Sequence, residues 1–415
     1  MWLSLSGLNT PGRGIRRMTL RFFPASERRK LMSKSTSHWP PTPSSLRTAF
    51  DDAPPYTVGL EDEVMLLAPE TLELVPRAPE VLALLDGDRR FKLELPASQL
   101  EIVTPVAARV EDSASALLEA RRMLAERAEG HVRLASAGVH PFSPGSGELN
   151  RLPRYESTIA QYGPIARLQL VCALQIHVAV GDADRALAVY NAARSYLPLL
   201  AALAANAPFY EGRDTGLASV RPAIGRLLPR QGIPPPIAGW DAYAETFRWG
   251  AATRTFETAQ TWWWELRLHP SFGTLEFRVP DGQSTVADAT AIAALTQALV
   301  AWLGERHDAG EQLEVAETWQ IEENRWLACR DGVEGEMAQL GASARRRPTR
   351  ELLRELIERL APAATRLGSE RALTHAARMV EANGSIAQRQ AAEFGGAGAV
   401  ARWLSERFLE EPAWG

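Results

Sequence analysis

Acidic side chains that could hold a metal ion lie close together in a predicted strand near the start of the folded part. Residues 58–65 read V-G-L-E-D-E-V-M, and alternation along a strand places Glu61 and Glu63 on one face, with α-carbons about 6.7 Å apart. Two carboxylates there repel each other unless a cation lies between them. Mg²⁺ suits such a gap because it takes oxygen ligands. The alternative is a solvated strand face without an ion.

Two later segments add polar groups of the same kind. The segment E-L-P-A-S-Q-L-E contributes Glu94 and Glu101, although this pattern alone is nonspecific. The predicted strand Ile165–Val180 places Gln175 and His177 on the face opposite its apolar side chains. A single histidine in such a position is more often a hydrogen-bonded structural group than a ligand.

Two further strands, Trp262–His269 and 274–280, are predicted on either side of a P-S-F-G turn. Each presents charged groups on one face: Glu265, Arg267 and His269 on the first, Glu276 and Arg278 on the second. The alternative is a ladder of cross-strand ion pairs, each worth about 1 kcal/mol or less. We expect the W-W-W run that opens the first strand to be core rather than a stacking surface for a base.

A long loop over residues 211–239 carries two arginines beside glycines, in the sequence G-R-D-T-G-L-A-S-V-R. Arg213 and Arg221 could bind a carboxylate or a phosphate, because a guanidinium binds both with two hydrogen bonds. Loops of this length in compact domains are usually functional. The alternative is a capped turn that leads into a helix.

Five carboxylates are therefore predicted on strands of one sheet: Glu61, Glu63, Glu94, Glu101 and Glu276. Such a set cannot be buried without cations. Two or three divalent ions holding a polyphosphate would neutralise it.

The elements that must position these residues follow an irregular order. Strands come early and in the middle of the chain, with helices between them and a helical region after Asp288. This order favours an α+β fold on a mostly antiparallel sheet. The other predicted elements are strands at Tyr56–Leu67, 92–104 and 133–139, and helices at 111–129 and 182–205, the last with a kink at Pro198.

Composition excludes several classes of protein. Residues 1–50 contain nine basic residues and one acidic residue, whereas the rest carries 37 basic and 49 acidic residues. The acidic body argues against nucleic acid as a partner. Only Lys30, Lys34 and Lys92 are lysines, and no P-loop motif exists. Phosphate chemistry would therefore use arginine and metal ions.

Two cysteines, Cys172 and Cys329, cannot build a disulfide framework, so we expect a reducing compartment, the cytoplasm. Cys172 lies on the apolar face of its predicted strand and is expected in the core rather than as a nucleophile. No window of 18 uncharged apolar residues predicts a membrane span.

The first 55 residues are rich in Arg, Ser and Pro, which predicts a disordered extension. Their composition also resembles a transit peptide, and a start codon assigned too early, with Met18 or Met32 as the true start, is the alternative. The predicted organisation is thus an extension over residues 1–55 and one catalytic domain over residues 56–415, of which 288–415 is mainly helical.

Taken in order, the motifs resemble the carboxylate–amine ligase group of the glutamate–cysteine ligase type 2 family. They are V-G-L-E-D-E, E-L-P-A-S-Q-L-E, A-G-V-H-P-F, C-A-L-Q-I-H-V, A-N-A-P-F-Y-E-G-R-D-T-G-L-A-S-V-R and R-L-H-P-S-F-G-T-L-E-F-R-V-P-D. The resemblance implies a glutamine synthetase-like catalytic fold. In that fold a mostly antiparallel sheet forms an open funnel, with helices packed on one face and a helical C-terminal region.

By resemblance, each motif residue takes a role. Glu63, Glu94 and Glu101 would bind one Mg²⁺ or Mn²⁺. Glu61 and Glu276 would bind the ion that handles the γ-phosphate of ATP, and Arg278 would stabilise the transferring phosphoryl group. The residues suggested for substrate binding are Arg213, Arg221, His140 and His177.

Several positions depart from the family pattern, and residue 175 is the most important of them; the family strand reads C-G-L-H-V-H-V-G. Gln175 stands where the first histidine, expected to help hold the second metal, is usual. A glutamine carbonyl can ligate Mg²⁺, but it is neutral and cannot act as an acid or base. Ala173 and Ala179 stand at positions where the family has glycine, and Glu265 stands where the family has aspartate. We therefore expect slow or altered phosphoryl transfer.

The resemblance implies an ATP-dependent ligase with weak glutamate–cysteine ligase activity through an acyl phosphate. Two other functions stay open: a phosphotransferase of the same fold, and a non-catalytic regulator that binds nucleotide or amino acid. We expect neither nucleic acid nor a membrane as a partner. A homodimer is expected only because symmetric dimers are common.

Overall fold

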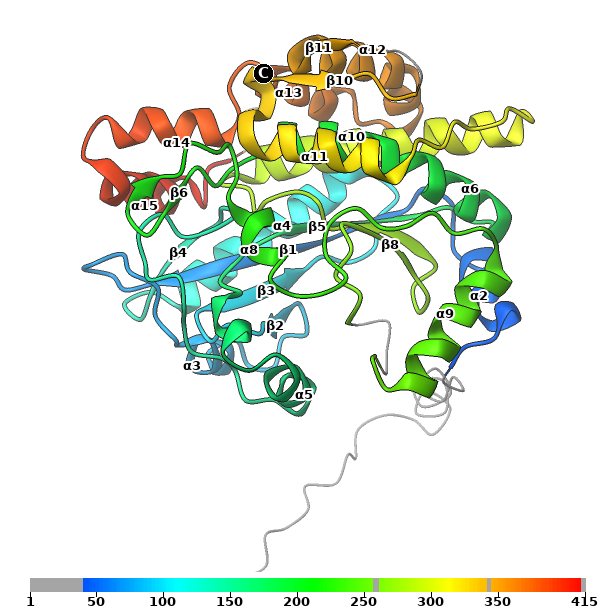
Figure 1. Cartoon of the computed structure of the whole chain (residues 1–415). Coiled ribbons are helices and arrows are strands. Elements are labelled where there is room, and N and C mark those ends of the chain that lie inside the picture. Colours follow the sequence, from blue (N-terminus) through cyan, green and yellow to red (C-terminus); the bar gives the residue numbers. More distant parts are fainter. Residues whose placement is uncertain (1–39, 257–260, 342–344, 412–415) are drawn as a thin grey trace, which may run out of the picture. The chain divides into compact units, whose positions relative to one another are not determined.

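An open seven-stranded sheet forms the centre of the molecule (Figure 1). The computed structural model describes residues 40–256, 261–341 and 345–411. Six strands follow the order β2-β3-β1-β5-β9-β8, β4 pairs with β1, and all pairings are antiparallel. The strands are β1 (Val58–Leu67), β2 (Phe91–Leu93), β3 (Gln99–Val103), β4 (Arg133–Ala135), β5 (Leu174–Ala179), β8 (Leu266–His269) and β9 (Thr274–Phe277). The α+β class with an open, mostly antiparallel sheet is confirmed.

The two faces of the sheet differ because side chains alternate along each strand. On one face the register partners Leu60, Ile176 and Phe277 are fully buried. Helices cover this face (Figure 1): α4 (Val110–Arg127), α6 (Ala183–Ala193) and α10 (Val286–Asp308). The opposite face is left to the acidic side chains.

One ion pair is buried beneath this helical layer. Asp62 and Arg121 of α4 are both fully buried, and the guanidinium lies 2.9 Å from the carboxylate. Arg121 also donates hydrogen bonds to the backbone oxygens of Gln283, Ser284 and Phe408. The pair therefore ties β1 to α4, to the segment before α10 and to the residue that follows α15.

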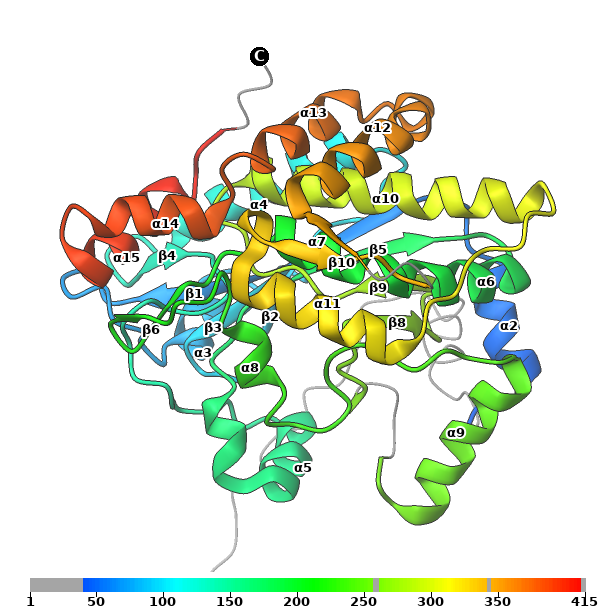
Figure 2. The ribbon, with the colours of Figure 1, turned by 45° about the horizontal axis from the view of Figure 1, so that its top comes forward.

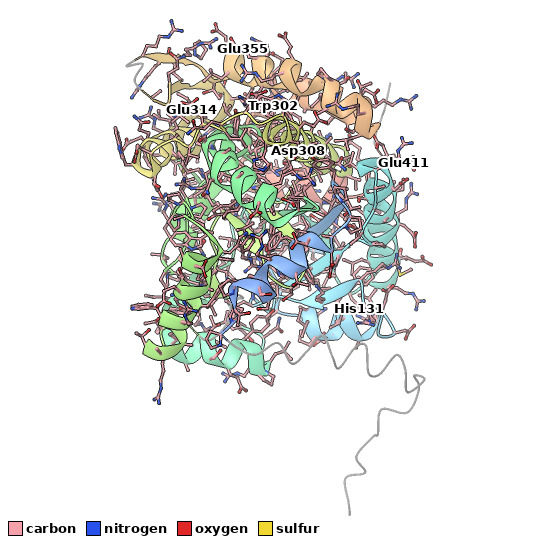
Figure 3. All side chains as sticks on the ribbon, turned by 90° about the vertical axis from the view of Figure 1, so that its right-hand side faces the viewer. His131, Trp302, Asp308, Glu314, Glu355 and Glu411 are labelled. Atoms are coloured by element: carbon pink, nitrogen blue, oxygen red, sulfur yellow. The ribbon has the colours of Figure 1, made fainter. Side chains whose placement is uncertain are left out.

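The C-terminal helices pack on three parts of the fold: α12 and α13 on α10, α11 on α7, and α15 on β4 and α14. Helices α12 and α13 contact α10 directly (Figure 2). Trp302 of α10 lies beneath α12 (Figure 3), with the guanidinium of Arg359 5.7 Å from its ring centroid. The helices of this region are α11 (Thr318–Asp331), α12 (Thr349–Leu367), α13 (Glu370–Met379), α14 (Gly384–Ala392) and α15 (Gly396–Arg407).

Helix α10 is long and apolar enough to cross a membrane by length and composition alone. Its most apolar stretch is 89% buried inside the protein. It is the central helix of the fold.

The folded part begins earlier than the predicted boundary at Tyr56. Helix α2 (Pro43–Asp51) starts at a capping box formed by Thr42 and Ser45, and buries Leu46 and Phe50 in the main core. The average composition of the first 55 residues is polar, so it does not reveal this one amphipathic helix. The prediction for residues 1–39 falls outside the described residues.

Helix α2 packs against the turn between β8 and β9. Gly273 in that turn has φ +67°, and a β-carbon there would lie 1.9 Å from the carbonyl oxygen of Ala49. Only glycine fits both the backbone conformation and the close contact. This contact braces the turn that carries Phe272.

Several predicted elements differ from the structure in their bounds. The strand predicted over Trp262–His269 begins only at Leu266, and the one predicted over 133–139 ends at Ala135. The strand predicted to begin at Ile165 begins only at Leu174, because Gly163, with φ +56°, and Pro164 lead into a 3₁₀ helix over residues 163–168. The region after Asp288 is not wholly helical, because residues 336–348 include the strand pair β10 and β11 between glycines and Pro348. The helices predicted at 111–129 and 182–205 are confirmed as α4 and as α6 with α7.

The remaining elements are α3 (Ala78–Ala83), α5 (Pro153–Tyr162), α7 (Leu197–Leu203), α8 (Arg221–Gly225), α9 (Trp240–Thr253), β6 (Phe209–Tyr210), β7 (Arg213–Asp214), β10 (Glu336–Ala338) and β11 (Arg346–Pro348). Of these, α5 and α8 border the open face, whereas α7, β10 and β11 pack against the C-terminal helices.

Removing one partner of the buried ion pair should be costly. Arg121→Met leaves Asp62 buried without its cation, and we expect a loss of about 3–5 kcal/mol in the free energy of unfolding. Urea denaturation at pH 7 measures it. The control is Arg354→Met, which breaks a half-exposed pair with Glu381 and should cost about 1 kcal/mol or less. Equal losses would contradict the role given to burial.

Candidate active site

A row of charged and polar side chains crosses the open face of the sheet. Antiparallel register partners share a face, so six strands contribute to one polar surface. A cavity of about 730 Å³ lies over it, bordered by α5 and α8. The partners in the row are Lys92 and Glu101, Glu101 and Glu63, Glu61 and Gln175, His177 and Glu276, and Glu276 and Arg267.

Glu63 lies at the centre of this row and is short of positive charge. Its carboxylate accepts hydrogen bonds from the backbone amide of Ala173 at 2.7 Å and from Nε2 of Gln175 at 2.8 Å. Burial raises the pKa of Glu63 to about 7, although Arg278 and the Ala173 amide pull it down. A carboxylate with so high a pKa is ready to accept a cation.

Glu276 has the opposite environment. Arg267 binds it with two hydrogen bonds, at 2.6 and 2.9 Å, and Arg278 lies 2.5 Å from Oε1. Burial opposes ionisation, but the two guanidinium groups hold the pKa of Glu276 well below its usual range. Arg278 also donates to the side-chain oxygen of Gln175. Gln175 therefore links Glu63 to Arg278.

Glu61 and His177 meet beside Glu276. Burial raises the pKa of Glu61, but contact with His177 outweighs it and lowers the pKa to about 2. The two side chains are 3.6 Å apart, and one ligand atom from each of Glu61, His177 and Glu276 lies within 4.8 Å of the others. These three groups form a second place where a cation would fit.

Glu94 and Glu101 border the cavity near Glu63. Lys92 lies 2.9 Å from Oε1 of Glu101 and is half-exposed. Burial and the nearby Glu61 raise the pKa of Glu101, against the pull of Lys92. Three carboxylates thus approach one region of the cavity with a single lysine among them.

The residues present fit divalent cations. Oxygen donors suit Mg²⁺ and Mn²⁺, and the raised pKa of Glu63 marks an unmet need for positive charge. In the second cluster, Nε2 of His177 is buried without a hydrogen-bond partner among the described residues. Both clusters lie on the same sheet face, where a polyphosphate could bridge them.

Two residues predicted to bind substrate lie outside the cavity lining. Arg213 is exposed in the short strand β7, paired with Tyr210. His140 is buried, with Nε2 2.8 Å from the backbone oxygen of Leu72 and Nδ1 accepting from the amide of Ser143 at 2.9 Å. Burial lowers the pKa of His140 to about 4, so the ring is neutral at pH 7, and a role in substrate binding stays a prediction.

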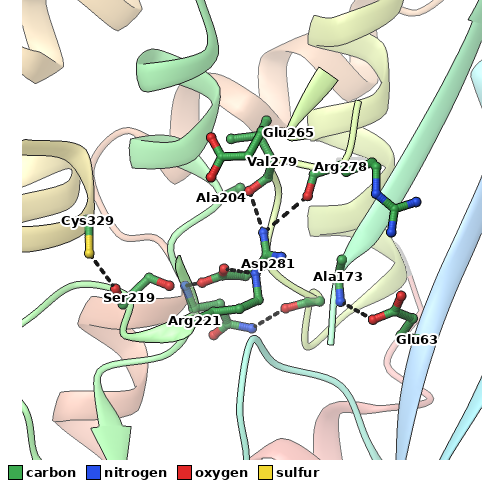
Figure 4. Close-up of polar contacts among 12 residues, drawn as sticks. Glu63, Ala173, Ala204, Ser219, Arg221, Glu265, Arg278, Val279, Asp281 and Cys329 are labelled. Carbon is green, nitrogen blue, oxygen red and sulfur yellow. Dashed lines mark hydrogen bonds and ion pairs between the residues drawn. The ribbon is translucent and has the colours of Figure 1, made fainter. Parts of the chain in front are cut away.

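Arg221 does line the cavity, but its side chain is anchored. It donates to Asp281 at 2.7 Å and to the backbone oxygens of Arg278 and Val279 (Figure 4). In this arrangement it holds the segment after β9. A role in substrate binding stays a prediction.

Glu265, another departure from the family pattern, is used structurally. Its carboxylate accepts a hydrogen bond from Nε of Arg325 on α11 at 2.8 Å, and its backbone oxygen accepts from the amide of Arg278. Helix α11 is therefore joined to the segment that carries Arg278. Sequence alternation alone placed Glu265 in a strand and missed this contact.

Sequence reasoning also missed the aromatic wall of the cavity. Phe256, Trp263 and Phe272 line it, and Trp262 stacks on Phe247 in the core at 4.6 Å. The W-W-W run thus serves both the core and the cavity. Cys172 is fully buried, as predicted for a core residue.

Comparison with protein families gives an extended match. A model described as "Glutamate-cysteine ligase family 2" matches residues 57–406. A protein from Rubrobacter xylanophilus named "Putative glutamate--cysteine ligase 2-3" is 40% identical over 332 residues, 78% of this chain and 89% of its own. One from Frankia casuarinae named "Putative glutamate--cysteine ligase 2-1" is 32% identical over 360 residues, 85% of this chain and 94% of its own.

Two solved structures share the fold. The glutamate–cysteine ligase of Francisella tularensis, in complex with AMP, matches with a TM-score of 0.62 and 11% identity, over 87% of this chain and 91% of that one. The bifunctional glutathione synthetase of Pasteurella multocida matches with a TM-score of 0.59 and 14% identity. The match covers 88% of this chain and 53% of the synthetase. At these identities the likeness concerns the fold alone.

The charge state of Glu63 should be visible in stability. Its pKa rises from 4.5 to about 7 on folding, so the folded protein keeps a proton that the unfolded chain has released between these values. Metal-free protein should therefore lose stability from pH 5 to pH 8. Glu63→Gln stays neutral and should be more stable than the unsubstituted protein at pH 8, by about 1–3 kcal/mol.

Urea midpoints in EDTA at pH 5 and pH 8 measure this effect. Glu126→Gln, at an exposed position on α4, is the control and should change neither midpoint. Equal stability of Glu63→Gln and the unsubstituted protein at pH 8 would contradict the assigned charge state.

Proposed function

This chain belongs to glutamate–cysteine ligase family 2, and from that membership we propose that it joins the γ-carboxyl group of glutamate to the amino group of cysteine. Its relatives and family place it among ATP-dependent carboxylate–amine ligases. Glutamate and cysteine as the substrates, and a weak activity with them, are the proposed part. The reaction converts ATP to ADP and phosphate.

One observation carries the proposal. Five glutamates line a single cavity on the open side of the sheet, together with Lys92 and five arginines, one of which is Arg278. Lys92 is the one lysine among the residues that line this cavity, and it is paired with Glu101. The neighbouring carboxylates Glu63, Glu94 and Glu101 disfavour a polyphosphate beside them unless divalent ions accompany it. Arg278 then faces the transferring phosphate. This is the arrangement expected of enzymes that transfer a phosphoryl group by positioning and charge neutralisation.

The proposed mechanism begins with binding. Glu63, Glu94 and Glu101 would hold one Mg²⁺ or Mn²⁺, and Glu61 and Glu276 a second. Divalent ions bound there neutralise the phosphate oxygens of ATP. Arg267 keeps Glu276 in place through two hydrogen bonds.

Chemistry then follows in two steps. An oxygen of the substrate carboxylate attacks the γ-phosphorus, the bond to the β-phosphate oxygen breaks, and ADP leaves. Arg278 donates hydrogen bonds to the phosphoryl oxygens as charge develops. The amine next attacks the acyl carbon, phosphate leaves, and the amine loses a proton to form the amide. The aromatic wall of Phe256, Trp263 and Phe272 would limit access of water to the acyl phosphate.

Two other functions are alternatives to the ligase. In a phosphotransferase the phosphorylated product would accumulate without an amine. In a non-catalytic regulator, ATP would bind without turnover, and the neutral Gln175 at a metal-site position is the feature that favours this reading. Arg221 would contact substrate in either enzyme.

The setting of the protein is also a proposal. Both cysteines are buried free thiols, which suits a cytoplasmic enzyme. The net charge of −4 gives no basis for a nucleic-acid or membrane partner. A homodimer remains an expectation from the frequency of symmetric dimers.

Phosphate release tests the reaction class. With Mg²⁺ and ATP, we expect the full chain to release phosphate only when glutamate and an amine are both present. Mass spectrometry should find the γ-glutamyl amide. Release with an acid alone, with a stable phosphorylated product, would identify a phosphotransferase. ATP binding without release for any amino-acid pair would identify a regulator.

Arg278 should act on the transition state. Arg278→Gln removes the positive donor while Glu276 keeps Arg267, so we expect kcat to fall by about 10²–10³ with a small change in KM for ATP. Steady-state kinetics measure the split. Arg248→Gln, at an exposed arginine of α9, is the matched control. A rise in KM alone would assign Arg278 to ground-state binding.

A further inference from the structure

His177 carries a buried nitrogen that lacks a partner. The residue lies in β5, is 8% exposed, and its Nε2 makes no hydrogen bond to any described residue. Buried polar atoms in native proteins are nearly always satisfied by protein, water or an ion. The environment of this nitrogen therefore points to a ligand.

Thr274 orients the imidazole ring for such a ligand. Its Oγ1 lies 2.9 Å from Nδ1 of His177. When Nδ1–H donates to this hydroxyl oxygen, Nε2 holds the lone pair. Metal-binding histidines are commonly fixed in this way, with the other ring nitrogen hydrogen-bonded to a neighbour.

Nε2 is directed at two carboxylates. It lies 3.6 Å from Oε1 of Glu61, and the ligand atoms of both glutamates and the histidine lie within 4.8 Å of one another. Around an ion with bonds of about 2.1 Å, adjacent ligand atoms are about 3 Å apart, so small side-chain movements would complete the set.

Glu276 can take part although two arginines bind it. A carboxylate offers about four acceptor positions, and Arg267 and Arg278 use three of them. The remaining lone pair is available to an ion. The neighbouring arginines would weaken the affinity, which a nitrogen ligand would help to offset.

Gln175, by contrast, is committed elsewhere. Its amide nitrogen donates to Glu63 at 2.8 Å and its oxygen accepts from Arg278. An oxygen facing a guanidinium is a poor ligand for a second cation. His177, two positions further along β5, offers an Nε2 lone pair to an ion when its proton lies on Nδ1.

We infer that His177, together with Glu61 and Glu276, forms a mixed nitrogen–oxygen cation site that favours Mn²⁺ and related transition ions over Mg²⁺. The preference follows because imidazole suits transition metals, whereas Mg²⁺ prefers oxygen ligands. The inference rests on the proposed function only in taking this ion to be the second ion of the same cavity. Nε2 of His177 binds that ion in place of the side chain of Gln175.

Pulsed electron paramagnetic resonance on the full chain saturated with Mn²⁺, without nucleotide, tests the site directly. A histidine ligand adds a nitrogen hyperfine coupling to the Mn²⁺ signal. The cluster of Glu63, Glu94 and Glu101 offers only oxygen and would be silent. We expect the coupling in the unsubstituted protein and its loss in His177→Gln.

His269 is the matched control. It is a buried neighbour whose ring lies 5.6 Å from that of His177, and its Nδ1 also lacks a hydrogen-bond partner among the described residues. Its ring stacks on Phe272 at 4.1 Å. His269→Gln should keep the coupling.

Calorimetric titration with Mn²⁺ and with Mg²⁺ gives a second readout. His177→Gln should weaken Mn²⁺ binding at one site by about 10–100-fold and change Mg²⁺ binding much less. Thr274→Val keeps His177 and removes the hydroxyl group that bonds its Nδ1, so it should weaken Mn²⁺ binding about 10-fold. This variant tests the site even if His177→Gln fails to fold.

Each outcome is decisive. No coupling in the unsubstituted protein, or a coupling that persists in His177→Gln and disappears in His269→Gln, would overturn the inference. Coupling and its loss as expected, without ligase activity, would leave this site standing and overturn the proposed function alone. Ligase activity without coupling would do the reverse.

Discussion

One constraint organises this molecule: carboxylates side by side in a poorly hydrated place need positive charge nearby. Glu276 receives it from Arg267 and Arg278, and its pKa is held well below the usual range. Glu63, three strands away from the edge strand that supplies Arg267, does not, and burial raises its pKa to about 7. The protein's own cations therefore neutralise Glu276 near one edge of the sheet and leave Glu63, at the centre of the polar row, short of positive charge. That shortage is the physical basis for expecting divalent ions and a polyphosphate on this face.

The E-D-E sequence of β1 shows how a single strand divides its charges. Because the side chains alternate, Asp62 points away from its two neighbours and into the helical layer, where Arg121 pairs with it completely. Arg121 also binds three backbone oxygens from segments far apart in the chain. The middle carboxylate thus holds the scaffold in register, and the flanking Glu61 and Glu63 are presented to the cavity by a strand that is fixed from behind.

Local patterns predicted what depends on alternation, and failed where distant contacts decide. The shared face of Glu61 and Glu63 and the cross-strand pair of Arg267 with Glu276 follow from a period of two, and the register confirms both. Helix α2 was missed because its stability comes from burying Phe50 against distant elements. Arg213 was predicted to bind substrate from its glycine-flanked loop and the family motif; it lies exposed in β7, outside the cavity lining, and its role stays a prediction. No local signal reveals that Gln175 is held by Glu63 and Arg278, since its partners lie 112 and 103 residues away.

The same period of two explains how a site could tolerate glutamine at a family metal position. Residues 175 and 177 lie on one face of β5, about 6.6 Å apart along the strand, and they face different partners on the neighbouring strands. Gln175 is opposite Glu61, and His177 is opposite Glu276. A ligand moved by two residues therefore stays on the polar face and still meets both carboxylates. Gln175 is then free to join Glu63 to Arg278, and so to link the two cation-binding regions. A histidine at position 175 could not make this link with the nitrogen that binds the metal.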